Sequence, residues 1–333
     1  METKEPLVSV ILPTYNVATY LLKCLCSIEC QTYTNIEVYI IVDGATDGSA
    51  EIANDFCKSH KRFHYVWQEN QGSGPARNKG MQLSKGQFLC FIDPDDWVEP
   101  NYIEQLVRFQ QEKEYDYVVV SGRTYYQRNG EESFSTELNV CNVETLNSAK
   151  DVHASFNRLF QQGLFDAPHH KLFVKQIIES NGICFPALRR SQDIVFNLLY
   201  LEHVKNVKIS DYVGYNYRSF IGPRSFVTID NYITAVDAIY DIIKKIVCKW
   251  GLHETPEEIC YRFAHNLVYL SYDNKTELRK LSKCKLFNIL IRMGKPKSIH
   301  MRCTNFLIRN HMYAILGLYY ACVNKIKFMR RKK

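Results

Sequence analysis

Short apolar runs alternate with longer amphipathic stretches through the first half of the chain. The runs are β-branched or aromatic and nearly continuous, which is typical of strands covered on both faces. They lie at residues 8–12, 37–42, 64–67 and 87–92. Helical patterns occupy roughly residues 17–30, 49–60, 75–84 and 101–113. This alternation predicts a mostly parallel α/β sheet with flanking helices.

The later pattern is less regular. A fifth strand is expected at 117–121, followed by a hairpin whose strands, 123–128 and 131–136, flank Asn129 and Gly130. That dipeptide suits a type I′ turn. Residues 147–210 are expected to be mainly helical, and 212–218 to form a last strand. From about residue 230 the pattern is helical, with breaks predicted at Pro256 and Pro296.

Composition narrows the class of protein. With 46% apolar and 23% charged residues among 333, the chain is neither disordered, collagen-like nor a coiled coil. We read no signal peptide at the N-terminus and no run of the ~20 apolar residues that span a bilayer. The twelve cysteines form no CxxC pair. For Cys24, Cys26 and Cys30, reduced thiols are favoured over a zinc site.

The net charge of +7 is unevenly distributed. Residues 231–333 hold 20 Lys and Arg against 7 Asp and Glu, whereas residues 1–230 hold 22 against 28. Residues 312–323 are uncharged, rich in tyrosine and followed by a basic end. This segment is too short to span a membrane but suits an interfacial helix on anionic lipid. The alternative is a terminal helix packed on the preceding part of the chain. Nucleic acid would also suit the charge, but no recognised motif supports it.

Four successive predicted strands end in polar, glycine-rich or acidic loops. In open α/β sheets, ligands bind beyond the carboxyl ends of the strands. These loops are therefore the predicted functional site. They occupy residues 13–16, 43–49, 69–78 and 93–97.

Three carboxylates, Asp93, Asp95 and Asp96, fall within four residues. They repel one another, and a hard divalent cation such as Mg²⁺ or Mn²⁺, shared with a diphosphate, would offset that repulsion. The alternative is an acidic turn that caps the helix starting near residues 100–101.

The other loops supply candidate ligand contacts. Gly72 and Gly74 make a poor dinucleotide fingerprint, because the third glycine is missing and the loop follows the third strand. Arg77 is better interpreted as a phosphate or nucleotide contact, which does not exclude pairing with a carboxylate such as Asp43. Asp43 ends an apolar strand and could accept a hydrogen bond from a base, or form an Asx-turn in its own loop.

Taken together, SVILPTYN, IIVDGATDGS, ENQGSGPARNKG and FIDPDDWVEP resemble family 2 glycosyltransferases, the inverting nucleotide-sugar enzymes of GT-A fold. The resemblance continues through HHKLFVKQIIESNGICFP, RRSQDIVFNLLYLEH and DYVGYNYRS, and covers about residues 7–225. It implies a GT-A (Rossmann-like) domain over 1–228. Residues 229–333 are then a basic helical extension with a possible role at the membrane.

The resemblance also implies roles for individual residues. The donor-binding set is Pro13 and Tyr15 at the nucleoside, Asp43 at the base, Arg77 at the nucleotide and diphosphate, and Asp93 toward the ribose. The DxD motif is formed by Asp93 and Asp95, with Asp95 and Asp96 on Mg²⁺ or Mn²⁺. Asp193 is implied as the general base.

Three positions depart from the family's pattern. Val42 replaces the first of two acids before Asp43, and Gln192 replaces the acid before Asp193. A neighbouring carboxylate would raise the pKa of Asp193, and Gln192 would not. His169 and His170 stand where the family often has Trp-Asn, which could alter donor or acceptor preference.

The expected function is metal-assisted, single-displacement transfer of a sugar from a nucleotide sugar, with UDP the favoured nucleotide. The acceptor is expected to be a hydroxyl of a surface-polysaccharide or lipid-linked glycan, at a cytoplasmic location that could include the inner face of the cell membrane. A nucleotidyltransferase is disfavoured, because the loop after the first strand lacks a glycine-rich segment with a basic residue. A non-catalytic nucleotide-sugar-binding or scaffold protein at the membrane surface is the remaining alternative.

Overall fold

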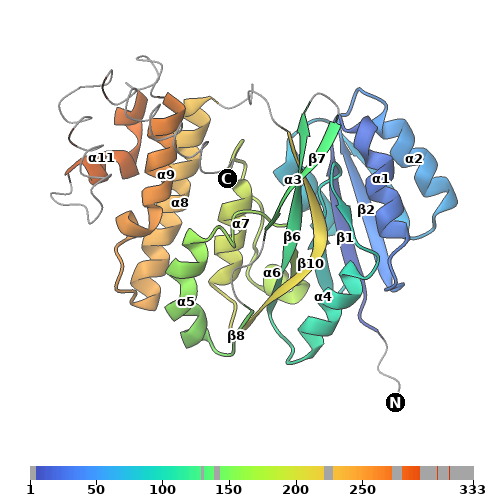
Figure 1. The fold of residues 1–333 in the computed structure, drawn as a ribbon, viewed down its shortest axis with the longest axis horizontal. Coiled ribbons are helices and arrows are strands. Elements are labelled where there is room, and N and C mark those ends of the chain that lie inside the picture. The colour runs from blue at the N-terminus through green and yellow to red at the C-terminus, as the bar shows by residue number, and fades with distance from the viewer. Residues whose placement is uncertain are drawn as a thin grey trace. The chain divides into compact units, whose positions relative to one another are not determined.

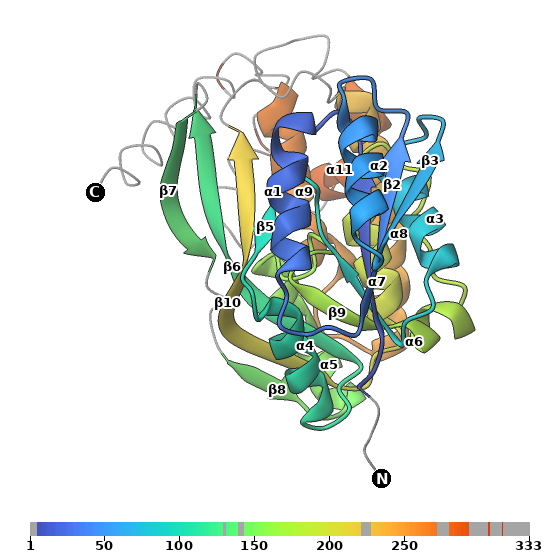
Figure 2. The same ribbon diagram turned by 90° about the vertical axis from the view of Figure 1, so that its right-hand side faces the viewer.

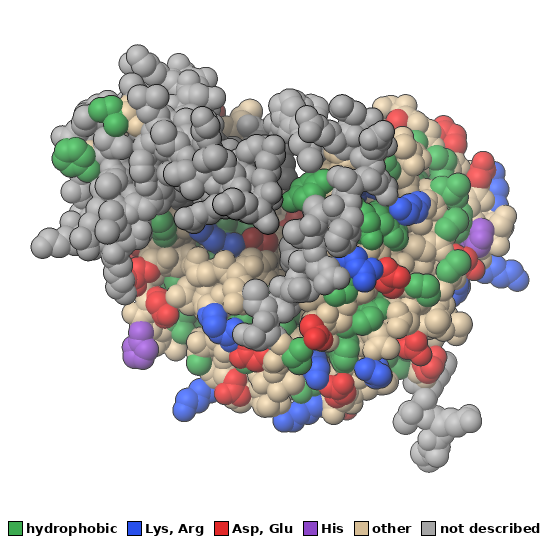
Figure 3. All heavy atoms as spheres, viewed as in Figure 1, with side chains coloured by type: hydrophobic (Ala, Val, Ile, Leu, Met, Phe, Trp, Pro, Cys, Tyr) green, Lys and Arg blue, Asp and Glu red, His purple; other side chains and the backbone are tan. Residues whose placement is uncertain are grey.

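The computed structural model describes residues 5–128, 131–138, 143–220, 228–271 and 280–292, together with Phe306 and Ile315. The chain divides into two compact units. One comprises Met1–Ala187 and Gln192–Arg224, and the other comprises Leu188–Ser191 and Ser225–Lys333. Acidic and basic side chains are interspersed over the described surface in Figure 3.

Four parallel strands form the first half of the sheet in the first unit. Their order is β3-β2-β1-β4. They are β1 (Val8–Thr14), β2 (Ile36–Asp43), β3 (Phe63–Gln68) and β4 (Phe88–Phe91). The connecting helices are α1 (Ala18–Glu29), α2 (Ser49–Ser59) and α3 (Ser73–Leu83). The α/β architecture expected from the sequence is confirmed (Figures 1 and 2).

The second half of the sheet is mixed. The short strand β9 (Lys171–Val174) runs antiparallel between β4 and β6 (Tyr117–Arg128), and β10 (Val207–Phe220) is parallel to β6. Strand β9 falls in a region expected to be mainly helical. Its four residues are too few to show a periodicity, and its pairing partners are distant in sequence. Antiparallel pairing also joins β5 (Trp97–Val98) and β8 (Glu144–Leu146) to β10.

Strand β6 is one continuous strand over positions where two separate runs were expected. It pairs antiparallel with β7 (Glu131–Leu138), with Arg128 opposite Glu131. The predicted turn at Asn129 and Gly130 lies outside the described residues. The remaining helices of this unit are α4 (Tyr102–Gln111), α5 (Ala149–Gln161), α6 (Lys175–Ser180) and α7 (Gln192–Leu201).

The second unit is helical over most of its described part, while Leu188–Ser191 is irregular. It contains α8 (Ile229–Trp250), α9 (Pro256–Ser271), a 3₁₀ turn at Leu281–Lys283 and α11 (Lys285–Arg292). Helix α8 begins where the Thr228 side chain accepts from the backbone N–H of Asn231, and it ends at Gly251 with φ 61°. None of the described helices is long and apolar enough to cross a bilayer. Pro296 and residues 312–323, apart from Ile315, lie outside the described part.

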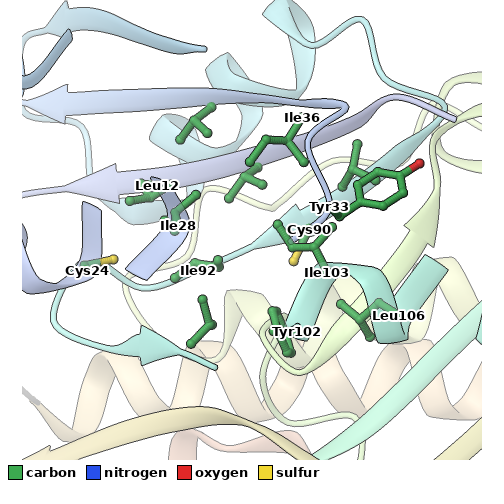
Figure 4. Close-up of a cluster of buried hydrophobic side chains, with 14 of the residues drawn as sticks. Leu12, Cys24, Ile28, Tyr33, Ile36, Cys90, Ile92, Tyr102, Ile103 and Leu106 are labelled. Carbon is green, nitrogen blue, oxygen red and sulfur yellow. The ribbon is translucent and has the colours of Figure 1, made fainter. Parts of the chain in front are cut away.

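The core lies on both faces of the first four strands. Because successive strand residues point to opposite faces, Val38 and Ile40 pack in the cluster that includes residues of α1, α2 and α4, part of which Figure 4 shows. Tyr39 and Ile41 instead pack against Ala76 of α3. Burial on both faces explains the uninterrupted apolar runs, and it fixes the strand ends from which the polar loops extend.

Candidate active site

Hydrogen bonds bring the predicted strand-end loops together. The Asn16 side chain, after β1, accepts from the N–H of Thr46 in the loop after β2, at 2.8 Å. Asp43, at the end of β2, accepts from the N–H groups of Gln71 and Gly72 at 2.9 and 2.7 Å, and from the Gln68 amide at 2.7 Å. Asp43 therefore holds the loop after β3 and does not form an Asx-turn in its own loop.

Pro13 and Tyr15 lie at the end of β1 beside these loops. Pro13 is buried within the strand, while the Tyr15 side chain is half-exposed. An exposed aromatic ring at a strand end can stack on a planar ligand. The geometry is therefore compatible with the nucleoside contact that the resemblance implies.

Arg77 joins two carboxylates that are far apart in sequence. Its guanidinium is 5% exposed and donates to Asp93 through Nη2 at 2.8 Å and to Asp193 through Nη1 at 2.9 Å. The possible pairing with Asp43 does not occur, since both Asp43 oxygens accept hydrogen bonds from Gln68 and the next loop. Helix α3 instead presents Arg77 to the end of β4 and to the first turn of α7.

Two carboxylates compensate the buried charge of Arg77. Burial alone would lower the pKa of the guanidinium, but Asp193 and then Asp93 raise it above its ordinary value. The Asp193 carboxyl responds in the opposite way, because burial raises its pKa while Arg77 opposes the rise. Its Oδ1 bonds to Arg77, and within the described residues Oδ2 has no hydrogen-bond partner. One oxygen of this carboxylate is thus left for a ligand.

Strand β10 fixes the acidic turn after β4. The Tyr215 hydroxyl accepts from the backbone N–H of Asp93 at 3.0 Å and donates to Asp96 Oδ2 at 2.7 Å. Asp96 Oδ1 accepts from the backbone N–H of Arg218 at 2.7 Å. Helix α4 begins at Asn101 without a side-chain cap, so the acidic turn does not serve as a helix cap. The sequence pattern did not mark Tyr215 or Arg218 as site residues, although both lie within DYVGYNYRS.

The carboxylates of Asp93, Asp95 and Asp96 repel one another. Burial and then the charge of Asp93 raise the pKa of Asp95 to about 6. Burial, followed by Asp95 and Asp93, raises the pKa of Asp96 well above its usual range. Arg218 donates through Nε to the backbone carbonyl of Asp95, at 2.9 Å, and its charge partly opposes the rise in the pKa of Asp95. A cation would relieve this repulsion.

The donor set fits a divalent cation. Asp93, Asp96 and His169 each offer one ligand atom, and these atoms lie within 4.8 Å of one another. Carboxylate and imidazole ligands suit Mn²⁺, and carboxylates suit Mg²⁺. The sequence predicted Asp95 and Asp96 as metal ligands. Of these, only Asp96 belongs to this group of three, and His169 was not predicted as a ligand. The only sequence signal for His169 was its departure from the family's pattern.

His169 and His170 form a buried, neutral pair beside this cluster. Their Nδ1 atoms are 2.7 Å apart, so one imidazole donates and the other accepts. Burial lowers the pKa of both imidazoles well below the ordinary value. The charge of Lys171 lowers the pKa of His169 further, and His169 and then Lys171 lower the pKa of His170 further. The His169 ring stacks on Tyr215, with centroids 4.8 Å apart.

Gln192 links the two helices that carry Arg77 and Asp193. Its amide donates to the Ser73 hydroxyl at the start of α3, at 2.5 Å. A Cβ added to Gly74 would lie 2.2 Å from the Gln192 amide oxygen, so a larger residue at this position would displace the Gln192 amide. The residue that departs from the family's acidic pair therefore has a structural contact of its own.

Comparisons with known proteins agree with this arrangement. The family model described as Glycosyl transferase family 2 matches residues 9–182. The glycosyltransferase EpsH of Bacillus subtilis (strain 168) is 36% identical over 186 residues, which cover 56% of this chain and 52% of EpsH. Glycosyltransferase GlyG of Streptococcus pneumoniae serotype 4 is 35% identical over 213 residues, covering 62% of this chain and 68% of GlyG. The chain thus spans about half the length of EpsH.

The fold is shared with a solved structure. Residues 1–349 of S. aureus TarS, in complex with UDP, superimpose with a TM-score of 0.66 at 17% identity, covering 96% of this chain and 91% of that one. The mixed sheet with flanking helices is therefore a GT-A fold. The chain belongs to glycosyl transferase family 2, as the strand-end motifs predicted.

Proposed function

We propose that this protein is an inverting glycosyltransferase that moves a sugar from a UDP-linked donor to a hydroxyl of a glycan or lipid-linked acceptor. The observation that carries the proposal is the Arg77 bridge. It holds Asp93, from the acidic strand end, and Asp193, from the first turn of α7, at 2.8 and 2.9 Å from one guanidinium. A leaving-group site and a proton acceptor are thereby adjacent.

The nucleotide would occupy the loops at the ends of β1 to β3. Pro13 and Tyr15 would border the nucleoside, with Asp43 holding the loop that contacts the base and Asp93 facing the ribose. Solved structures of S. aureus TarS contain UDP and UDP-GlcNAc, which favours a uridine nucleotide here. Arg77 would orient the diphosphate with the donor hydrogens that its two carboxylates leave unused.

A divalent cation, Mg²⁺ or Mn²⁺, would be held by Asp96 and Asp95, together with Asp93 or His169 from the same cluster. When bound, it would neutralise charge on the leaving diphosphate. The raised pKa values of Asp95 and Asp96 support this assignment, since burial and the neighbouring carboxylates outweigh the favourable interactions that these two groups have.

Asp193 would act as general base. Its unpartnered Oδ2 would accept the proton of the acceptor hydroxyl as that oxygen attacks the anomeric carbon from the face opposite the diphosphate. One displacement inverts the anomeric centre. Arg77 holds the carboxylate ionised and fixes its orientation, whereas burial keeps it more basic than an exposed aspartate.

We also propose that the basic end of the chain attaches the protein peripherally to an anionic membrane surface. Support comes from the sequence alone, because no acidic residue follows Glu277 while 15 basic residues do. The attraction would come from these basic residues, and it would weaken as salt rises.

The test is a panel of nucleotide sugars incubated with the full chain and Mn²⁺, with and without excess EDTA. Thermal stabilisation by UDP and release of UDP from donors are measured on the same samples. We expect UDP to raise the melting temperature only with metal, and at least one UDP-sugar to be consumed. Asp55→Asn, at an exposed ion pair on α2, serves as the control variant. Stabilisation without turnover of any donor or acceptor mixture would indicate a nucleotide-sugar-binding protein.

A further inference from the structure

The imidazole of His169 is the one nitrogen ligand in the group that it forms with Asp93 and Asp96. One atom of each residue lies within 4.8 Å of the others, yet among the described residues no hydrogen bond joins His169 to either carboxylate. His169 and His170 are also the positions at which this chain departs from the family's usual Trp-Asn. A role of His169 toward the cation would therefore be a property of this chain.

The two ring nitrogens of His169 have different surroundings. Nδ1 lies 2.7 Å from Nδ1 of His170 and is engaged in that hydrogen bond. Nε2 has no hydrogen-bond partner in the described part of the chain, and it is not sealed from solvent as Nε2 of His170 is. A metal-bound histidine characteristically donates its other N–H to a fixed acceptor. His169 has this arrangement when Nδ1 carries the proton, because Nε2 then keeps a lone pair for a cation.

Neighbouring aromatic rings fix the orientation of the His169 ring. It stacks on Tyr215, with centroids 4.8 Å apart and planes 16° apart, and it lies perpendicular to His170 at 4.2 Å. The Tyr215 hydroxyl also bonds to the backbone N–H of Asp93 at 3.0 Å and to the Asp96 carboxylate at 2.7 Å. One side chain therefore contacts all three residues of the group, which places their ligand atoms in advance of any ion.

The backbone at His170 supports this pairing of the two imidazoles. Adjacent side chains of an extended segment point to opposite faces, whereas these two rings meet. His170 has a φ of 64°, in the left-handed region that residues other than glycine seldom adopt. Its carbonyl accepts from the N–H of Val120 in β6 at 2.9 Å. Gly122 leaves room for the ring, because a Cβ there would lie 2.3 Å from His170 Nε2. Strained residues held in this way cluster at ligand sites.

A nitrogen ligand narrows the choice of cation. Mg²⁺ takes oxygen ligands, demands near-ideal octahedral geometry and retains its waters. First-row transition-metal ions accept imidazole as well as carboxylate, and they bind such mixed sites more tightly as the series proceeds from Mn²⁺. Carboxylates alone would admit Mg²⁺ and Mn²⁺ alike. The imidazole therefore favours the transition-metal ions.

We propose that His169 is a ligand of the active-site cation through Nε2 and makes the site selective for a first-row transition-metal ion over Mg²⁺. His170 is the positioning residue, which accepts from Nδ1–H of His169. This inference rests on the proposed function, in which either Mg²⁺ or Mn²⁺ could serve.

The experiment uses the full chain with UDP and with Mn²⁺ as the probe. Pulsed electron paramagnetic resonance records the modulation that a ligated ¹⁴N nucleus imposes on the Mn²⁺ signal, and titration with Mg²⁺ measures competition. We expect a nitrogen signal in the wild type, replaced by the ¹⁵N pattern after ¹⁵N-histidine labelling. His169→Asn should lose the signal, and ~tenfold or more less Mg²⁺ should displace its Mn²⁺. His64→Asn, at an exposed histidine of β3, is the matched control and should behave as the wild type.

His170→Phe tests the positioning role, because it keeps a ring and removes the acceptor. Mn²⁺ affinity should fall ~10-fold or more, the scale for residues that orient a metal-bound histidine. Mg²⁺ affinity should fall less, since the proposed nitrogen ligand matters less to that ion. An equal loss for both ions would show that His170 is only structural.

Mn²⁺ bound by the wild type without a histidine nitrogen signal would overturn the ligand assignment, and the labelled wild type gives this result without any substitution. An unchanged signal and unchanged Mg²⁺ competition in His169→Asn would overturn it as well. Thermal stabilisation by UDP and release of UDP from donors are recorded on the same samples. A wild type that binds neither UDP nor Mn²⁺ and consumes no donor would contradict the proposed function instead, so the two failures are distinguishable.

Discussion

Replacing Asp193 by Asn separates catalysis from structure at the centre of the site. Asn preserves the shape of the side chain and can still accept a hydrogen bond from Arg77, but it cannot take a proton. We expect turnover to fall ~10²-fold or more, the scale of general-base catalysis. That loss corresponds to about 2.7 kcal/mol in the activation barrier.

The effect on stability follows from the ion pair. Arg77 is buried and retains Asp93 at 2.8 Å after the substitution, so its charge stays compensated. A hydrogen bond to a charged group contributes ~1.5–3 kcal/mol and a neutral one ~1 kcal/mol. Because Asp193 is 30% exposed, the low end of the charged range applies, and the loss is about 0.5 kcal/mol. For a unit of this size the melting temperature should fall ~1–2 °C.

The assay measures sugar transfer, UDP affinity by calorimetry and thermal unfolding on the same preparation. UDP affinity should change little, since Arg77, the nucleotide contact that bonds to Asp193, keeps its ion pair with Asp93 at 2.8 Å. Asp55→Asn removes a carboxylate from an exposed pair with Lys58, and it should alter neither turnover nor stability measurably.

The reasoning is refuted if Asp193→Asn turns over normally. It is also refuted if UDP binding is lost together with a melting temperature far lower than estimated, because Asp193 would then be a structural carboxylate. The proton acceptor would have to be sought at His169 or His170.

Three further outcomes are expected. Asp95→Asn should abolish metal-dependent UDP stabilisation, yet in EDTA it should stabilise the fold at pH 7.5 by up to about 3 kcal/mol. Because the pKa of Asp95 is raised to about 6, its ionised carboxylate opposes folding above that pH. Denaturant titrations should therefore show that the gain in stability of the variant disappears below ~pH 4. An equal gain at ~pH 7.5 and below ~pH 4 would contradict this. Gln192→Glu should raise the pKa of Asp193 and move the acid limb of the pH–rate profile to higher pH, whereas an unmoved limb would show that the two groups do not interact. Removing residues 304–333 should weaken sedimentation with anionic vesicles, most at low salt, and equal sedimentation would favour a packed terminal helix.

The local pattern of apolar and polar residues was sufficient to predict the elements in which buried residues follow one another along the chain. The runs at 8–12 and 37–42 became β1 and β2, buried over their whole length, because strands covered on both faces admit few polar residues. The same logic located the four polar loops, since a strand's end marks where burial stops. Strand β9 could not be found this way, because its pairing with β4 and β6 is a tertiary event.

The sequence by itself determined the family, the parallel first half of the sheet and the candidate residues from Pro13 to Asp193. Only the tertiary structure decided which of them meet. Arg77 and Asp193 are 116 positions apart, and Tyr215 reaches Asp96 across 119. Periodicity reports which face of an element is buried, but contacts between distant side chains depend on strand order and helix packing. For the same reason the sequence suggested Asp43 as a possible partner of Arg77, whereas packing of α3 against the β4 end and α7 selected Asp93 and Asp193.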